Sequence, residues 1–95
     1  MTNFDPQRFR IVVRGRVQNV GYRLFTHGAG IALGVTGTVR NLPDGSVETI
    51  AQADPATLGR FLAALRVGPP TGSVDGLSLE PLDPDPSLSG FDIIR

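Results

Sequence analysis

The segment FRIVVRGRVQNVGYR, residues 9–23, contains the succession of strand, loop and helix from which the fold can be predicted. Apolar residues at positions 9, 11 and 13 alternate with arginines at 8, 10 and 14, a pattern typical of a strand with one face covered and the other in water. Residues 15–21 have no sustained period and begin and end with glycine, which indicates a loop. A helix is expected to begin at Tyr22.

Two segments space their apolar residues as the buried stripe of a helix does. The first begins at Tyr22, has apolar residues at 25, 29, 32 and 33, and reaches a stop signal at Gly34. The second begins with Asp54 as an N-cap and Pro55 at the first helical position, and has apolar residues at 58, 61, 62 and 65. Gly68 and the two prolines after it end the second helix.

Three further strands and a short final one complete the chain. Residues 35–41 and 46–53 predict two strands joined by a turn at 42–45, where Asp-Gly supplies the backbone freedom of a hairpin. Residues 74–82 predict a strand interrupted at Gly76, and 90–95 a short C-terminal strand. The order β-α-β-β-α-β plus a short strand predicts one α+β domain over residues 1–95. Its fold is a ferredoxin-like split β-α-β sandwich, with two helices on one face of an antiparallel sheet.

Composition excludes several kinds of site. The 95 residues include no cysteine and one histidine, His27, which excludes a disulfide framework, a thiolate nucleophile and a zinc ribbon, and argues against a histidine-rich metal site. An apolar content of 40% is typical of a globular chain. Because the first residues have no apolar signal segment and no apolar run approaches a membrane span, we expect a cytoplasmic protein without a membrane partner.

The charges are segregated along a chain whose net charge is zero. Residues 1–40 contain six arginines and one acid, a formal charge of +5, whereas residues 41–95 contain three arginines and eight acids, a formal charge of −5. All nine basic residues are arginine, which a coding bias would explain, but such a bias does not explain the segregation. The basic half is therefore expected to face an anion.

Known nucleotide-binding loops do not match residues 15–21. A Walker A loop requires four residues between its glycines and then Lys and Ser or Thr, but five residues separate Gly15 from Gly21 and no lysine follows. A dinucleotide fingerprint requires G-x-G-x-x-G before a helix, but the glycines at 28, 30 and 34 have the wrong spacing and lie inside the predicted helix. Both motifs are rejected.

The strand, the glycine-bounded loop and the helix with Arg23 in its first turn could nevertheless bind an anion. A helix N-terminus has unpaired backbone N–H groups and partial positive charge, successive loop amides can converge on phosphate oxygens, and a guanidinium adds a two-pronged contact. Glycine-rich turns also serve tight packing, so the loop alone leaves both interpretations open. Asn41, at the end of the second predicted strand, could lie nearby and orient a water through its side-chain carbonyl.

Two motifs at this separation, residues 15–23 (GRVQNVGYR) and 37–48 (GTVRNLPDGSVE), resemble the acylphosphatase family. The resemblance spans nearly the whole chain. It continues through Ala29, Leu33-Gly34, Phe61, Gly68-Pro69 and Phe91-Asp-Ile93.

The resemblance implies hydrolysis of the carboxyl-phosphate bond of acyl phosphates, which yields a carboxylate and inorganic phosphate. Arg23 would bind the substrate phosphate and Asn41 would position the attacking water. No metal or other cofactor is implied, and inorganic phosphate would be both product and inhibitor. The backbone amides of the loop would cradle the phosphate: Arg16, Val17, Gln18, Asn19, Val20, Gly21 and Tyr22.

Three residues depart from the family's usual pattern. Asn19 replaces a loop glycine, and asparagine is one of the few residues that tolerate positive φ. Tyr22 replaces a phenylalanine, a mild change where its hydroxyl reaches a partner or solvent. Thr38 replaces a frequent tryptophan, which would remove apolar area beside the site. Elsewhere, His27 is expected to face solvent, and Gln18 either braces the cradle or has a purely structural role.

Two functions other than catalysis share this fold. RNA-binding domains of this topology stack bases on aromatic residues of their central strands through a motif such as K/R-G-F/Y-G/A-F-V, and no such run exists here. A regulatory domain that binds a small anion without turnover is the second alternative. We expect a monomeric enzyme with an acyl phosphate substrate and no nucleic-acid partner.

Overall fold

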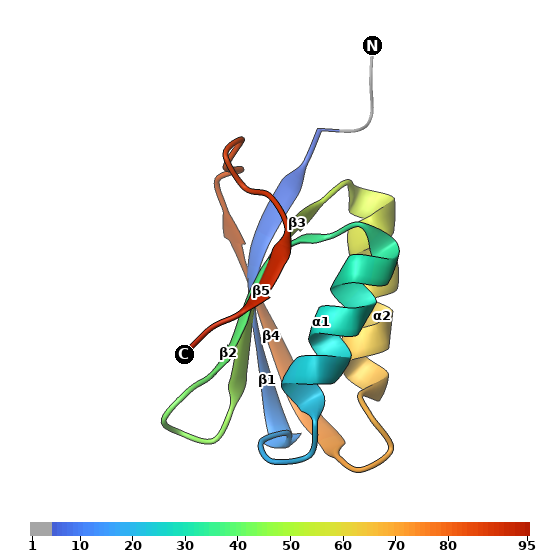
Figure 1. Cartoon of the computed structure of the whole chain (residues 1–95), viewed down its shortest axis with the longest axis vertical. Coiled ribbons are helices and arrows are strands. Elements are labelled where there is room, and N and C mark those ends of the chain that lie inside the picture. The colour runs from blue at the N-terminus through green and yellow to red at the C-terminus, as the bar shows by residue number, and fades with distance from the viewer. Residues whose placement is uncertain (1–4) are drawn as a thin grey trace.

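A computed structural model describes residues 5–95 as a five-stranded sheet with two helices on one face (Figure 1). The sheet order is β4-β1-β3-β2-β5, and this arrangement confirms the predicted fold class. Four strands pair antiparallel, whereas β5 runs parallel to β2, so the sheet is mixed at that edge. The elements are β1 (Gln7–Arg16), α1 (Tyr22–Leu33), β2 (Thr36–Asn41), β3 (Val47–Ala53), α2 (Pro55–Val67), β4 (Ser73–Leu82) and β5 (Phe91–Ile93).

The strand β4 is continuous where the sequence predicted an interruption. Arg14 of β1 pairs with Gly76, but the next residue of β1, Gly15, pairs with Val74. Asp75 is therefore the extra residue of a β-bulge, which bends the strand without ending it. The bulge lies at the end of β1 that leads into the 16–21 loop.

The predicted buried stripe of α2 is confirmed. Leu58, Phe61 and Leu65 are at most 3% exposed, and Leu62 packs against the same core with part of its surface open. Asp54 caps the helix as predicted, because its carboxylate accepts a hydrogen bond from the backbone N–H of Thr57 at 3.1 Å.

The predicted buried stripe of α1 is partly wrong. Ala32 is exposed, and the buried residues of the helix are Tyr22, Thr26 and Gly30. The reason is close packing against β5, since a Cβ on Gly30 would lie 2.7 Å from the ring of Phe91. The helix therefore approaches the sheet edge through a glycine, which a search for apolar spacing does not count.

Three connections gather at one end of the elongated molecule. Its extents are 42 × 22 × 21 Å, and the β1–α1 loop, the β2–β3 turn and the α2–β4 loop lie at the same end of the long axis (Figure 1). The loop and the turn carry the two motifs singled out in the sequence. Along residues 5–95, no helix has the length and apolar character needed to cross a membrane.

Candidate active site

The loop before α1 delivers the free amides of a helix N-terminus. Gly21 is the N-cap residue and adopts a left-handed conformation, with φ 79° and ψ 16°. Within the described residues, no side chain caps this end and the first turn of α1 contains no acid. The first N–H groups and the positive end of the helix dipole are therefore available to an anion.

Asn19 adopts the backbone conformation that its position in the loop requires. Its φ is 63°, and it is the one non-glycine residue between 5 and 95 with a positive φ. The next residue, Val20, is tied to the α2–β4 loop, because the Thr71 hydroxyl donates a hydrogen bond to its carbonyl at 2.6 Å. The loop is thus held in a conformation that asparagine tolerates better than most side chains.

Gln18 joins the loop to the β2–β3 turn. Its Nε2 donates hydrogen bonds to the carbonyl oxygens of Leu42, at 2.8 Å, and Ser46, at 2.9 Å. The turn is itself closed by a hydrogen bond from the N–H of Leu42 to the carbonyl of Ser46 at 2.8 Å. Because Leu42 directly follows Asn41, the side chain of Gln18 fixes the loop relative to the end of β2.

Asn41 is the last residue of β2, where it pairs with Val47 of β3. Its side-chain oxygen Oδ1 is buried and has no hydrogen-bond partner among residues 5–95. Within the same range, Arg8 Nε, Thr26 Oγ1 and Thr49 Oγ1 are likewise buried without a partner, and of the four residues only Asn41 belongs to one of the two motifs.

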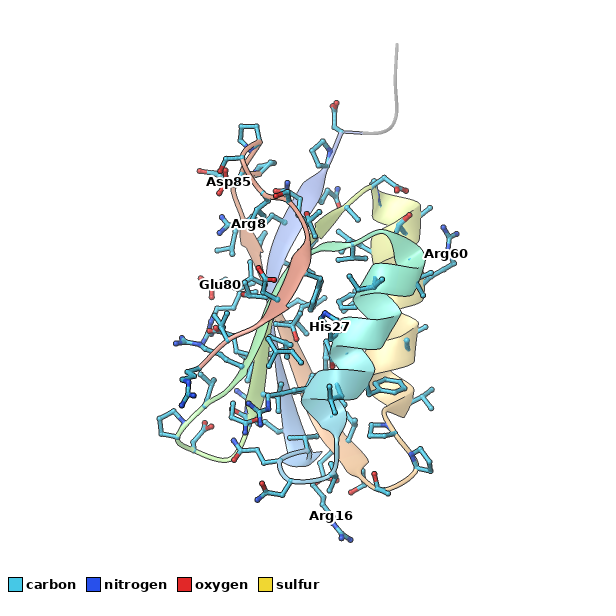
Figure 2. All side chains as sticks on the ribbon, viewed as in Figure 1. Arg8, Arg16, His27, Arg60, Glu80 and Asp85 are labelled. Carbon is cyan, nitrogen blue, oxygen red and sulfur yellow. The ribbon has the colours of Figure 1, made fainter. Side chains whose placement is uncertain are left out.

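A cavity of about 260 Å³ brings the two motifs together. Six of the residues predicted for the site line it, and the predicted loop residues Arg16, Gln18 and Val20 do not. Figure 2 shows Arg16 at this end of the molecule. Two lining residues, Leu24 and Ile93, were not predicted. The lining consists of Val17, Asn19, Gly21, Tyr22, Arg23, Leu24, Asn41 and Ile93.

Arg23 brings an uncompensated positive charge to this cavity. It lies in the first turn of α1 and is partly exposed. Within residues 5–95, ion pairs join Arg10 and Arg40 to Glu48, and Arg10 to Glu80, but none involves Arg23. A guanidinium without a carboxylate partner, beside free helix amides, is suited to hold an anion with several oxygens.

Comparison with known proteins identifies the family. A family model described as Acylphosphatase matches residues 9–93. The chain belongs to the acylphosphatase family.

Individual acylphosphatases are similar along most of the chain. That of Anaeromyxobacter dehalogenans (strain 2CP-C) is 45% identical over 89 residues, which cover 94% of this chain and 96% of the relative. That of Syntrophotalea carbinolica is 47% identical over 75 residues, which cover 79% and 82%. The crystal structure of acylphosphatase from Bacillus subtilis superposes with a TM-score of 0.90 at 31% identity, over 94% of this chain and 99% of that one.

Of the departures from the usual acylphosphatase pattern, Tyr22 is accommodated inside the core. The residue is 1% exposed, and its hydroxyl donates a hydrogen bond to the carbonyl of Leu65 at 2.7 Å. Burial raises the pKa of the Tyr22 hydroxyl well above its usual value, so the group stays neutral at physiological pH. Tyr22 therefore anchors the start of α1 to α2, and its hydroxyl proton is held in the hydrogen bond to the Leu65 carbonyl.

Two further residues singled out in the sequence, Thr38 and His27, lie outside the lining of the cavity. Thr38 lies in the middle of β2, opposite Ile50 of β3 and Asp92 of β5, and it does not line the cavity. His27 is partly buried rather than facing solvent, and its ring packs edge-on against Phe91 with centroids 6.1 Å apart.

Leu24 and Ile93 were missed for different reasons. Leu24 lies outside the buried stripe of α1, so the apolar spacing of the helix predicted no contact for its side chain. Ile93 approaches the cavity only because β5 pairs in parallel with β2, and the sequence did not predict that pairing. Among residues 5–95, no three His, Asp or Glu side chains gather closely enough to hold a metal ion.

Proposed function

We propose that this member of the acylphosphatase family hydrolyses acyl phosphates in the cavity that Arg23 and Asn41 line. The observation that carries the proposal is their pairing in one cavity: a guanidinium without a carboxylate partner and an amide side chain at the end of β2. The first is complementary to a phosphate and the second to a water molecule. The two reactants of the hydrolysis would thus meet in one place.

The phosphate would be held by backbone and by one side chain. The amides of residues 16–22 and the start of α1 would surround its oxygens, and Arg23 would neutralise its charge. The Gly21 conformation and the lack of an acid in the first turn of α1 support this role. Charge that spreads over the phosphoryl oxygens in the transition state would be stabilised by groups that are already oriented.

Asn41 would hold the attacking water through its Oδ1. Water has two protons to donate, and accepting one of them fixes its oxygen with a lone pair free to attack. Positioning a nucleophile in this way contributes to the rate mainly through entropy, because the water no longer has to be captured from bulk solvent.

The overall reaction balances without a redox partner or a further reactant. The water oxygen bonds to phosphorus, the bond from phosphorus to the acyl oxygen breaks, and its electron pair leaves on the carboxylate. A doubly charged acyl phosphate and one water thus give a carboxylate and dihydrogen phosphate. Because a carboxylate is a good leaving group, the site needs no strong general acid, and we propose that it works without a metal.

The test is an acyl phosphate assay in the presence of EDTA. We expect turnover to persist, inorganic phosphate to inhibit competitively, and Arg23→Ala or Asn41→Ala to lower kcat/KM by about 100-fold or more. Arg66→Ala is the matched control, since Arg66 is an exposed arginine of α2 that does not line the cavity. Thermal unfolding should be unchanged in all three variants.

Two results would contradict the proposal. Equal activity of wild type and both site variants would remove Arg23 and Asn41 from the mechanism. An inert wild type that instead binds single-stranded RNA with a steep salt dependence would favour an RNA-binding function. We further propose that the enzyme acts as a monomer, because one chain supplies every group that this mechanism uses. A cytoplasmic location is proposed as well, on the sequence pattern alone.

A further inference from the structure

Two large apolar side chains are exposed at the mouth of the cavity. Leu24 is 70% exposed and Ile93 is 38% exposed, and both line the same cavity as Arg23 and Asn41. Elsewhere in residues 5–95 the large apolar side chains with comparable exposure do not line this cavity; they are Ile31, Val67, Leu79 and Ile94. Single exposed apolar residues are common, but two beside a polar cavity indicate a ligand with an apolar part.

The two residues come from different elements that flank the cavity. Leu24 follows Arg23 in the first turn of α1, and Ile93 is the last residue of β5. Ile93 pairs with Val39 of β2, two residues before Asn41. The cavity therefore combines groups that attract a phosphate with apolar groups that do not.

We propose that Leu24 and Ile93 form a subsite for the acyl group of the substrate, and that the enzyme prefers apolar acyl phosphates to acetyl phosphate. The inference rests on the proposed function, which places the phosphate against the loop and Arg23. An acyl phosphate has one polar and one apolar end, as the cavity has. An aromatic or branched aliphatic acyl group would cover Leu24 and Ile93 and remove their surface from water, whereas an acetyl group is too small to reach both.

The size of the cavity supports a compact substrate. Its volume of about 260 Å³ lies just below the roughly 300–1,000 Å³ of sites that enclose drug-sized ligands. A phosphoryl group joined to one ring or a branched chain suits that space.

The experiment compares benzoyl phosphate with acetyl phosphate in wild type, Leu24→Ser and Ile93→Ser. Each variant should lower kcat/KM for benzoyl phosphate by roughly 3- to 10-fold and that for acetyl phosphate by less than about twofold, since the smaller group loses less apolar contact. Inhibition by inorganic phosphate should stay the same, because the phosphate cradle is intact. Both side chains are exposed, so folding should be preserved.

The chain offers a matched control for each variant. Ile94→Ser removes the neighbour of Ile93, which has nearly the same exposure at 39%, and Ile31→Ser removes an exposed side chain of α1 at 57%; neither residue lines the cavity. Both should keep the wild-type ratio of the two substrates. An unchanged ratio in Leu24→Ser and Ile93→Ser, with acetyl phosphate still hydrolysed, would overturn the subsite alone. A wild type inert towards both substrates would overturn the proposed function as well.

Discussion

A single amide side chain connects the two motifs of this acylphosphatase. Gln18 and Leu42 are 24 positions apart, and the hydrogen bonds of Gln18 to the carbonyls of Leu42 and Ser46 hold the loop against the turn that follows Asn41. We expect Gln18 to be a positioning residue, which sets where the cradle lies relative to the water held by Asn41.

Gln18→Glu should make activity depend on pH in a diagnostic way. Glutamate has nearly the same shape, but its carboxylate cannot donate a hydrogen bond to either carbonyl, and near neutral pH we expect kcat/KM to fall about tenfold. As the pH falls towards the carboxyl pKa of about 4.3, the protonated group can donate again, so the ratio of variant to wild-type activity should rise. Gln7→Glu, an exposed change at the start of β1, is the control. A pH-independent ratio would show that Gln18 has no such role.

The polar residues of the site could be predicted from the sequence, but the side chains and backbone groups that they contact could not. Arg23 and Asn41 were predicted from motifs, and the cavity contains both. The function of Gln18 stayed open because its acceptors depend on how the 42–46 turn folds onto the loop. Leu24 and Ile93 could not be found because exposed apolar residues have no sequence signature, and their proximity arises from tertiary packing.

Elements were predicted better than the faces they bury. Each observed helix and strand overlaps its predicted segment, because periodicity and capping residues act locally. The buried face of α1 was misassigned at Ala32, since Gly30 permits the close approach of Phe91 there. The bulge at Asp75 also depends on the partner strand, which a search along one chain segment does not consider.

Glu48 connects three strands on the open face of the sheet. From β3, its carboxylate accepts hydrogen bonds from Nε of Arg10 in β1, at 2.6 Å, and Nε of Arg40 in β2, at 2.8 Å. Its side chain is 8% exposed, and the two arginines are 37% and 41% exposed. Burial by itself would raise the pKa of Glu48, but the hydrogen bonds and charges of Arg40 and Arg10 outweigh it and lower the pKa below the usual 4.5.

Glu48→Gln should weaken the dependence of the free energy of unfolding on pH in the acidic range. Because the folded-state pKa lies below the unfolded value, the contribution of the carboxylate is complete above about pH 4.5 and is lost as the pH falls through the folded pKa. At pH 7 we expect the variant to be less stable by about 1 kcal/mol, a modest loss because both arginines are partly in water. As the pH falls through the folded-state pKa of Glu48, the stabilities of the two proteins should converge, as measured by denaturant unfolding.

Glu80→Gln is the control for this prediction. Glu80 also faces Arg10, but at 3.9 Å and with 62% of its side chain exposed. Its removal should leave the free energy of unfolding nearly unchanged at every pH. If Glu48→Gln and Glu80→Gln had equal effects, the connection between β1, β2 and β3 would contribute nothing specific.

Across the whole molecule, the charge segregation of the sequence is only partly kept in space: Arg10 and Arg40 pair with Glu48, and Arg23 is the arginine that lines the cavity. The basic half, residues 1–40, supplies β1, the loop and α1, and most of β2, and these contribute most of the lining. Arg16 lies at the end of the molecule where the three connections gather. Arg60 lies on the half of α2 that is away from this end (Figure 2). The Arg16 side chain is exposed and does not line the cavity, so its guanidinium can attract a doubly charged substrate from a distance, whatever its backbone amide contacts.

Arg16→Gln should therefore slow substrate capture in a salt-dependent manner. At about 0.01 M ionic strength, where charges act over roughly 30 Å, we expect kcat/KM for an acyl phosphate to fall about 2- to 5-fold; near 1 M, where the range is roughly 3 Å, the loss should vanish. Arg60→Gln removes the same charge far from the cavity and should have little effect at either salt concentration. A loss in Arg16→Gln that persists at high salt would mean that the guanidinium contacts the bound substrate, because a direct contact is screened far less than a long-range field.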